Sequence, residues 1–238
     1  MCLIIVAHRV SARFPLVIAA NRDEDYERPT RVADWWDDAP DVVGGRDVSA
    51  GGAWLAISRR GRFAAVTNLR GAIKRERSRG ELVHQFMTSD VEPRAYVESI
   101  DVMRFAGFHL FAGEVGGELA HLSEMPMLLD SGLHGVSNAP HGEIWPKVDL
   151  AIDAVRRAIA LDDANAIVDE LLRFLSTPRH TGKIEHEAFI IGDRYGTRAS
   201  TVIVATSDTI TFAERNFRAG GIPFGDVRRF TFASEDSR

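Results

Sequence analysis

Paired apolar runs joined by short polar turns are the feature of this sequence that most limits its fold. Residues 2–7 and 14–20 are apolar and rich in β-branched side chains, and a short polar stretch around Ser11 separates them. Residues 54–58 and 62–67 repeat this arrangement around a turn at Gly61. Short apolar runs a few residues apart are typical of β-hairpins. Hairpin links exclude a parallel doubly wound sheet, in which strands alternate with helices.

The remainder of the chain alternates between helical and strand-like patterns. Amphipathic periodicity predicts helices at residues 81–87, 94–105, 146–161 and 163–175. Further strands are predicted at 108–112, 118–122, 135–137, 189–191, 198–205, 209–214 and 228–232. The polar segment 21–52, which contains Pro29 and Pro40, is predicted to be an extended loop. This order predicts one α+β domain over residues 1–238, with two antiparallel sheets face to face and helix pairs outside.

Composition narrows the possible partners and cellular setting. The net charge of -5 and a pI near 5.9 imply no basic face, so nucleic acid and anionic membrane surfaces are poor candidate partners. The single cysteine excludes an internal disulfide and suits a reducing compartment. No signal peptide or transmembrane segment is recognisable, so we expect a cytoplasmic protein. The eight histidines match no zinc motif, and the paired glycines open no helix, so no metal and no cofactor are predicted.

Cys2 is the residue with the clearest chemical potential. Removal of Met1 would leave a thiol and a free α-amine on one residue. In reference peptides the pKa of the thiol is about 8.5 and that of the α-amine is about 8. Such a residue carries its own general base and needs no histidine partner. A cysteine near a terminus is otherwise a small hydrophobic residue at the start of a strand. Both interpretations remain open from this residue alone.

The first hairpin brings a charged segment close to Cys2. Its second strand ends in Asn21-Arg22-Asp23-Glu24, beside the start of the first strand. Arg22 would favour the thiolate form of Cys2, and Asp23 could hold the α-ammonium in place. The alternative is a surface ion pair at the start of a loop, which contributes little to stability.

Several short blocks then give the chain a family resemblance. In chain order, these blocks are Met1–Ile4, Ala20–Glu24, Arg28-Pro29, Gly44–Asp47, Gly51–Leu55, Gly61–Ala65, Thr67-Asn68, Ser78–Gly80, His134–Asn138, Trp145–Lys147 and Gly196–Arg198. Together they resemble the NRDE family, also called the transport and Golgi organisation protein 2 family. One departure is Ala53, where threonine is more usual in the family.

That family is in turn similar to cysteine-type N-terminal nucleophile (Ntn) amidases, such as penicillin V acylase and bile salt hydrolase. The resemblance implies a four-layer αββα sandwich. It also implies that Cys2 is the nucleophile and Arg22 the arginine that follows the second strand. Asp23 matches the site carboxylate, although Glu24 and Asp25 compete for that role.

Three more residues complete the site that the resemblance implies. Asn68 and Asn138 match the two asparagines of the amidases, whose amides could donate to a developing oxyanion. Each asparagine could instead cap the end of a strand in a turn. Arg198 matches the late arginine near the nucleophile.

Two functions from different classes follow. The first is hydrolysis of a peptide or non-peptide C–N bond with Cys2 as nucleophile. The second is a non-catalytic binding or trafficking role for haem, an acyl-lipid or an acyl-coenzyme A, because members of the family are associated with haem and lipid homeostasis. Trp35-Trp36 could line the mouth of a ligand site or pin the segment to the core. The basic cluster from Lys74 to Arg79 could contact a phosphate or carboxylate, or could be a solvated entry to a helix.

Overall fold

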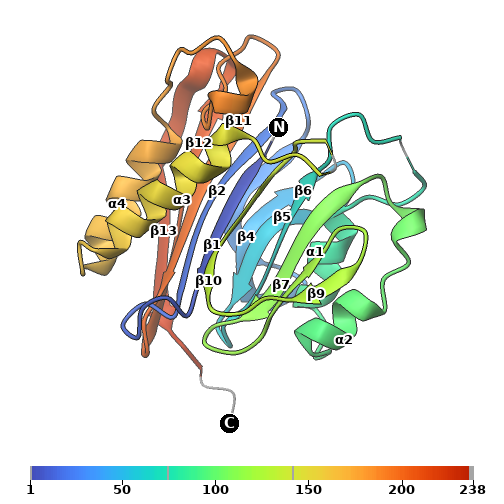
Figure 1. The fold of residues 1–238 in the computed structure, drawn as a ribbon, viewed down its shortest axis with the longest axis vertical. Helices are drawn as coiled ribbons and strands as arrows, with labels where there is room; N and C mark the ends of the chain where they lie inside the picture. Colours follow the sequence, from blue (N-terminus) through green and yellow to red (C-terminus); the bar gives the residue numbers. More distant parts are fainter. Residues whose placement is uncertain (1, 74, 141, 236–238) are drawn as a thin grey trace.

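The fold consists of two antiparallel sheets stacked face to face, with two helices on each outer side (Figure 1). The computed structural model describes residues 2–73, 75–140 and 142–235. One sheet has six strands in the order β10 (Gly132–Ser137), β1 (Leu3–His8), β2 (Leu16–Asp25), β11 (Tyr195–Ala205), β12 (Thr209–Arg218) and β13 (Ile222–Ala233). The other has seven strands in sequence order: β3 (Thr30–Trp36), β4 (Ala39–Asp47), β5 (Ala53–Ser58), β6 (Arg62–Asn68), β7 (Phe108–Glu114), β8 (Leu119–Leu122) and β9 (Pro126–Leu128). The α+β prediction is confirmed.

Three apolar layers explain why the strands have continuous hydrophobic runs. Between the sheets, Ile4 and Ile18 of one sheet pack with Phe63 of the other. Outside the six-stranded sheet, α3 (Pro146–Ile159) and α4 (Ala164–Leu175) cover the alternate residues, such as Leu3. Helices α1 (Gly80–Met87) and α2 (Pro93–Glu98) cover the seven-stranded sheet in the same way. A strand buried on both faces needs apolar side chains at nearly every position.

The segment 21–52 was wrongly predicted as a loop. Strand β2 continues through its charged end to Asp25, and residues 30–47 form the hairpin of β3 and β4. Strand β3 lies at the edge of its sheet and is half exposed, so its sequence is polar. Pro40 takes part in none of the strand pairs formed by β4, which is why a proline is tolerated there.

Three smaller elements also differ from the prediction. The helix expected over 94–105 ends at Glu98, and Asp101 caps a separate short 3-10 turn at Val102–Arg104 by accepting from the Met103 N–H. Residues 189–191 form no strand, although Ile190 exchanges hydrogen bonds with Thr197. The short strand β9 was not predicted.

Close packing fixes α3 against the strand pair at the centre of the candidate site. Gly135 on β10 faces this helix, and a Cβ atom there would lie 2.6 Å from Val148 Cγ1 and 2.7 Å from Ile5 Cδ1. A larger residue would therefore push the start of α3 away from β1 and β10.

Candidate active site

The register of three neighbouring strands determines what surrounds Cys2. Leu3 on β1 pairs with Asn21 on β2 and with Ser137 on β10. Antiparallel pairing continued by one residue therefore places Cys2 between Arg22 and Asn138. Cys2 is 9% exposed and Arg22 is 6% exposed. The sheet thus brings together three of the six residues that the sequence singled out.

Strand alternation places these side chains toward the space between the sheets. Cys2 shares the face of Ile4, which packs in the inter-sheet core, whereas Leu3 faces the helices. A cavity beside Cys2 is lined by Ile4, Ala20, Asn21, Arg22, Trp54, Leu55, Val66 and Thr201. Its volume of about 10 Å³ is close to the smallest space that holds one water molecule. The thiol therefore faces a nearly filled interior.

Arg22 is held by an aromatic ring and two carboxylates. Its guanidinium lies 4.4 Å from the centroid of Trp54 and forms ion pairs of 3.5 Å with Glu24 and 3.7 Å with Asp47. Burial lowers the pKa of Arg22 from its usual value, and Glu24, Cys2 and Asp47 oppose that shift. Arg28 binds the same two carboxylates, at 2.7 Å to Asp47 and 3.7 Å to Glu24. Arg22 is accordingly a fixed positive charge beside the thiol.

The three competing carboxylates occupy different surroundings. Asp23 is 4% exposed and accepts a 2.6 Å hydrogen bond from Thr197 Oγ1. Glu24 is bound by the two arginines just described. Asp25 binds Arg194 at 3.0 Å near the surface. Of the three, Asp23 is the buried one.

The two asparagines are placed differently. Asn138 follows β10 and is 5% exposed, and its side-chain Oδ1 is buried with no hydrogen-bond partner among the described residues. Among the described residues this buried oxygen is therefore an acceptor without a donor. Asn68 ends β6 opposite Phe108, and its side chain is exposed. No hydrogen bond is formed by the Asn68 side chain within the described part of the chain.

Arg198 binds backbone rather than the thiol. It lies where the pairing of β11 with β2 shifts register, between Thr197 and Ala199. Its guanidinium donates to the carbonyls of Asp25, Tyr26 and Arg28 at 2.9, 2.9 and 3.0 Å. Arg198 thereby holds in place the turn that follows β2. This turn positions Arg28 for its ion pair with Asp47.

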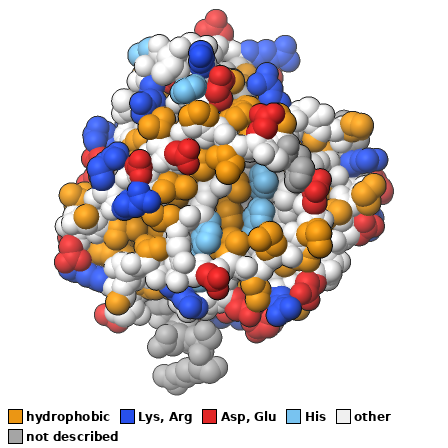
Figure 2. All heavy atoms as spheres, viewed as in Figure 1, with side chains coloured by type: hydrophobic (Ala, Val, Ile, Leu, Met, Phe, Trp, Pro, Cys, Tyr) orange, Lys and Arg blue, Asp and Glu red, His pale blue; other side chains and the backbone are white. Residues whose placement is uncertain are grey.

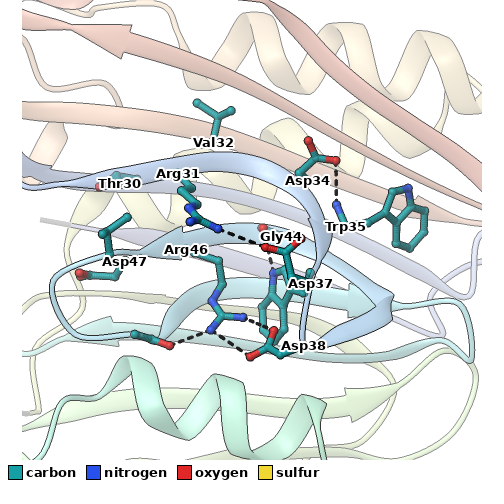
Figure 3. A pocket seen from close by; sticks show the side chains of 13 residues that line it. Thr30, Arg31, Val32, Asp34, Trp35, Asp37, Asp38, Gly44, Arg46 and Asp47 are labelled. Carbon is teal, nitrogen blue, oxygen red and sulfur yellow. Dashed lines mark hydrogen bonds and ion pairs between the residues drawn. The ribbon is translucent and has the colours of Figure 1, made fainter.

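A larger groove lies on the β3–β4 hairpin, which contains both tryptophans (Figure 3). It encloses about 740 Å³, within the range of small-molecule sites (roughly 300–1,000 Å³). Trp36 is 3% exposed and stacks on His84, whereas Trp35 is only partly buried and packs against Phe232. Arg31 pairs with Asp37 and Arg46 with Asp38 along the groove wall. Both expectations for the pair are thus met in part: the tryptophans pin the hairpin and line a groove.

Comparisons with known proteins agree with this fold. A family model described as "Transport and Golgi organisation 2" matches residues 1–219. The chain belongs to this family. It is 34% identical over 242 residues to the transport and Golgi organization protein 2 homolog of Bos taurus, covering 85% of this chain and 87% of that protein. The human homolog is 30% identical over 256 residues, with 92% of each chain covered.

Solved structures extend the likeness to the Ntn hydrolases. Penicillin V acylase from Agrobacterium tumefaciens superposes with a TM-score of 0.55 at 11% identity, covering 89% of this chain and 82% of that one. A mutant of the conjugated bile acid hydrolase from Clostridium perfringens gives a TM-score of 0.53 at 7% identity, covering 97% and 92%. At these identities the comparison establishes the fold alone. The expected Ntn-hydrolase-like sandwich of this transport and Golgi organisation 2 family member is confirmed.

Two basic residues near Cys2 were not among the six predicted site residues, although Arg79 belongs to the basic cluster noted in the sequence. Lys147 on α3 is completely buried, and Arg79 before α1 is partly buried. Cys2 opposes the lowering of the pKa that burial causes in each of them. Both stand in blocks that matched the family, Trp145–Lys147 and Ser78–Gly80. The signal available for Lys147 was its position directly after the proline that starts the helix, on a helix face whose other residues are apolar.

The histidines form a cluster rather than a metal site. His109 Nδ1 and His121 Nε2 are 3.2 Å apart, and burial lowers the pKa of His121 to about 4, with His109 and His134 adding to the shift. Figure 2 shows histidine side chains in the middle of one face, bordered by hydrophobic side chains. Among the described residues, no group of three or more His, Cys, Asp or Glu is arranged to hold a metal ion. In the same part of the chain, no helix is both long enough and apolar enough to cross a membrane.

Proposed function

We propose that this protein is an amide hydrolase that uses Cys2 as an N-terminal nucleophile. The observation that supports this most is the register that sets Cys2 between Arg22 and Asn138. Arg22 supplies a fixed positive charge, and Asn138 supplies an amide with no other hydrogen-bond partner on its buried oxygen. A thiol, a cation that favours its anion and an amide are the groups that acyl transfer requires.

The reaction needs Cys2 to become the first residue of the chain. Its α-amine then accepts the thiol proton, and the sulfur attacks the carbonyl carbon of a C–N bond. The Asn138 amide donates to the oxyanion that forms, and the α-ammonium returns the proton to the leaving nitrogen as the bond breaks. Water attacks the resulting thioester, which releases a carboxylic acid and restores the thiol. Asp23, two residues beyond Asn21 on β2, would orient the α-amine in this mechanism.

Mass spectrometry of the intact protein tests this sequence of steps. A chain that lacks Met1 and gains one acyl group from an N-acyl amide, with Cys2→Ala inert, is the expected result. Asn138→Ala should slow acylation by at least about 100-fold, since one oxyanion donor contributes about 2.7–4 kcal/mol. The Asn68→Ala variant, measured in parallel, tests whether that exposed residue also contributes. A retained Met1, or acylation unaffected by Cys2→Ala, would sink the proposal.

A second function is supported by the contrast between the two cavities. The cavity at Cys2 holds about one water molecule, whereas the groove on the β3–β4 hairpin encloses about 740 Å³. The groove combines an indole surface with Arg31 and Arg46 (Figure 3). Under this proposal the groove binds haem or an acyl-coenzyme A without cleaving it.

Titration with each ligand distinguishes binding from catalysis. We expect haem absorbance, or the fluorescence of the groove tryptophans with an acyl-coenzyme A, to change at micromolar ligand. Trp35→Ala should weaken that change, while Cys2→Ala should leave it intact. If neither ligand alters either signal, the binding role loses its support.

A further inference from the structure

A single buried lysine has no hydrogen-bond partner at the start of α3. Lys147 is 0% exposed, and its Nζ atom makes no hydrogen bond within the described residues. The sequence contains only three lysines; Lys183 is exposed, and Lys74 lies outside the described residues. Lysine is almost never fully buried unless it is paired. Lys147 therefore requires an explanation that packing alone does not provide.

The first turn of α3 directs Lys147 toward the candidate site. Helix α3 packs on β1 and β10, where Gly135 allows the close approach already described. The Lys147 Nζ atom lies 5.3 Å from the centroid of the Trp145 ring. On the helix side of the sheet the neighbouring residue of β2 is Asp23, since it shares a face with Asn21 and Leu3. Lys147 is thus on the opposite side of the sheet from the Arg22 side chain.

Two ionisable groups act on Lys147, and both belong to the site. Burial lowers the pKa of Lys147 from its usual value, and Asp23 and then Cys2 oppose that shift. The short 3-10 turn at Ile184–His186 also contacts α3 and carries two further titratable groups, Glu185 and His186. The charge of Lys147 is therefore coupled to the two groups that the amide hydrolase would use.

Stability gives no reason for an ammonium at this position. A buried charge without hydrogen bonds costs several kcal/mol of desolvation, and apolar replacements of such groups are often neutral or stabilising. A costly charged residue that adjoins a nucleophile is a candidate for a role in chemistry.

We propose that Lys147 is a positioning residue of the Cys2 site, whose buried ammonium favours the thiolate of Cys2 from the helix side of the sheet, where Asp23 also lies. The proposal rests on the proposed function only in taking Cys2 as the reactive group. Together with Arg22, Lys147 places one positive charge on each side of the sheet at the start of β1.

Alkylation of Cys2 across a range of pH tests the proposal without a substrate. Iodoacetamide labels the only cysteine, so adduct formation in the full-length protein reports the thiolate directly. The midpoint of the rate profile reports ionisation, while its plateau reports access to the buried thiol. In Lys147→Met the midpoint should rise on the order of one pH unit, with about tenfold slower labelling at pH 7.

Two further variants separate charge from packing. Lys147→Arg keeps a positive charge and should retain most of the wild-type midpoint, whereas Lys183→Met removes an exposed lysine and should leave it unchanged. Urea denaturation should find Lys147→Met at least as stable as wild type; if that variant does not fold, Lys147→Gln takes its place. A Lys147→Met midpoint equal to that of Lys183→Met would overturn the proposal. A protein with the predicted midpoint shift but no amide hydrolysis would instead refute the proposed function alone.

Discussion

Acidification from pH 7 to pH 5 should destabilise the fold through His8, which is buried, and His121, which is half-buried. His8 on β1 is 1% exposed, and His121 on β8 adjoins His109. Burial lowers the pKa of each from 6.5 to about 4, and a nearby His134 adds to both shifts. The unfolded chain therefore binds more protons than the folded chain between pH 6.5 and pH 4. Stability contributed by a depressed histidine pKa is complete above that window and is lost as the pH falls through it.

The size of the loss follows from these pKa values. For one histidine with folded and unfolded pKa values of about 4 and 6.5, the linkage relation gives a loss of about 2 kcal/mol between pH 7 and pH 5. His8 and His121 together would then remove about 4 kcal/mol, which is a large part of a typical domain stability of about 5–15 kcal/mol. Asp38, whose pKa is lowered to about 2, contributes only at lower pH. Glu214, whose pKa is raised by burial, offsets part of the loss to the same extent in wild type and in the histidine variants.

Urea denaturation at pH 7, 6 and 5 measures the loss directly. In His121→Phe, which keeps an aromatic ring beside Phe111, the loss between pH 7 and pH 5 should fall by about half, because one of two similar contributions is removed. His180→Asn is the matched control: His180 is exposed at a φ of 56°, which asparagine tolerates. A wild-type loss below about 1 kcal/mol, or a His121→Phe loss equal to that of the control, would refute the linkage argument.

Two other substitutions probe the buried charges between the sheets. Arg22→Met should lower the free energy of unfolding in urea by about 2 kcal/mol, because it removes the contact with Trp54 and leaves Asp47 with Arg28 alone. Unchanged stability would show that Arg22 contributes no net energy. Glu214 accepts hydrogen bonds from the Ala33 N–H and from Thr201, and burial raises its pKa. The folded protein therefore favours protonated Glu214 and loses stability as the pH rises. Glu214→Gln should therefore be more stable than wild type at pH 7 by about 1 kcal/mol and should match it near pH 4, as followed by thermal melting at both pH values.

The fold was predictable because apolar periodicity and turn residues agree along most of the chain. Both initial hairpins and both helices of the six-stranded sheet follow the pattern closely. The hairpin at 30–47 was not predicted, because β3 is an edge strand with one buried face and a shifted register. Its polar residues therefore resembled a loop. Its pairing depends on long-range contacts, such as the Ala33 N–H donating to Glu214. Local sequence contains no information about such a partner.

The sequence pointed to six candidate site residues, whereas their arrangement depends on the fold. Cys2, Arg22 and Asn138 come together because strand register is set by the apolar pattern. The carbonyl contacts of Arg198 could not be predicted, because they depend on a shift in register that lets its guanidinium bind three carbonyls. Lys147 was not predicted as a site residue, because its burial depends on how closely α3 approaches the sheet. The small Gly135 permits this close approach. Contacts between distant segments thus determine what sequence reasoning missed.

The polar and charged residues at the end of β2 contact two different layers of the fold and do not form one cluster. Asn21 faces the helices, where its amide donates to the carbonyls of Leu175 and Ala188. Asp23 faces the same side, whereas Arg22 lies between the sheets against Trp54. Because alternate residues of one strand point to opposite faces, the thiol and the main-chain nitrogen of Cys2 can be influenced from different layers. Changes in α3 should then alter the ionisation of Cys2 without changing the walls of its cavity, and changes at Trp54 should alter those walls while leaving Asp23 in place.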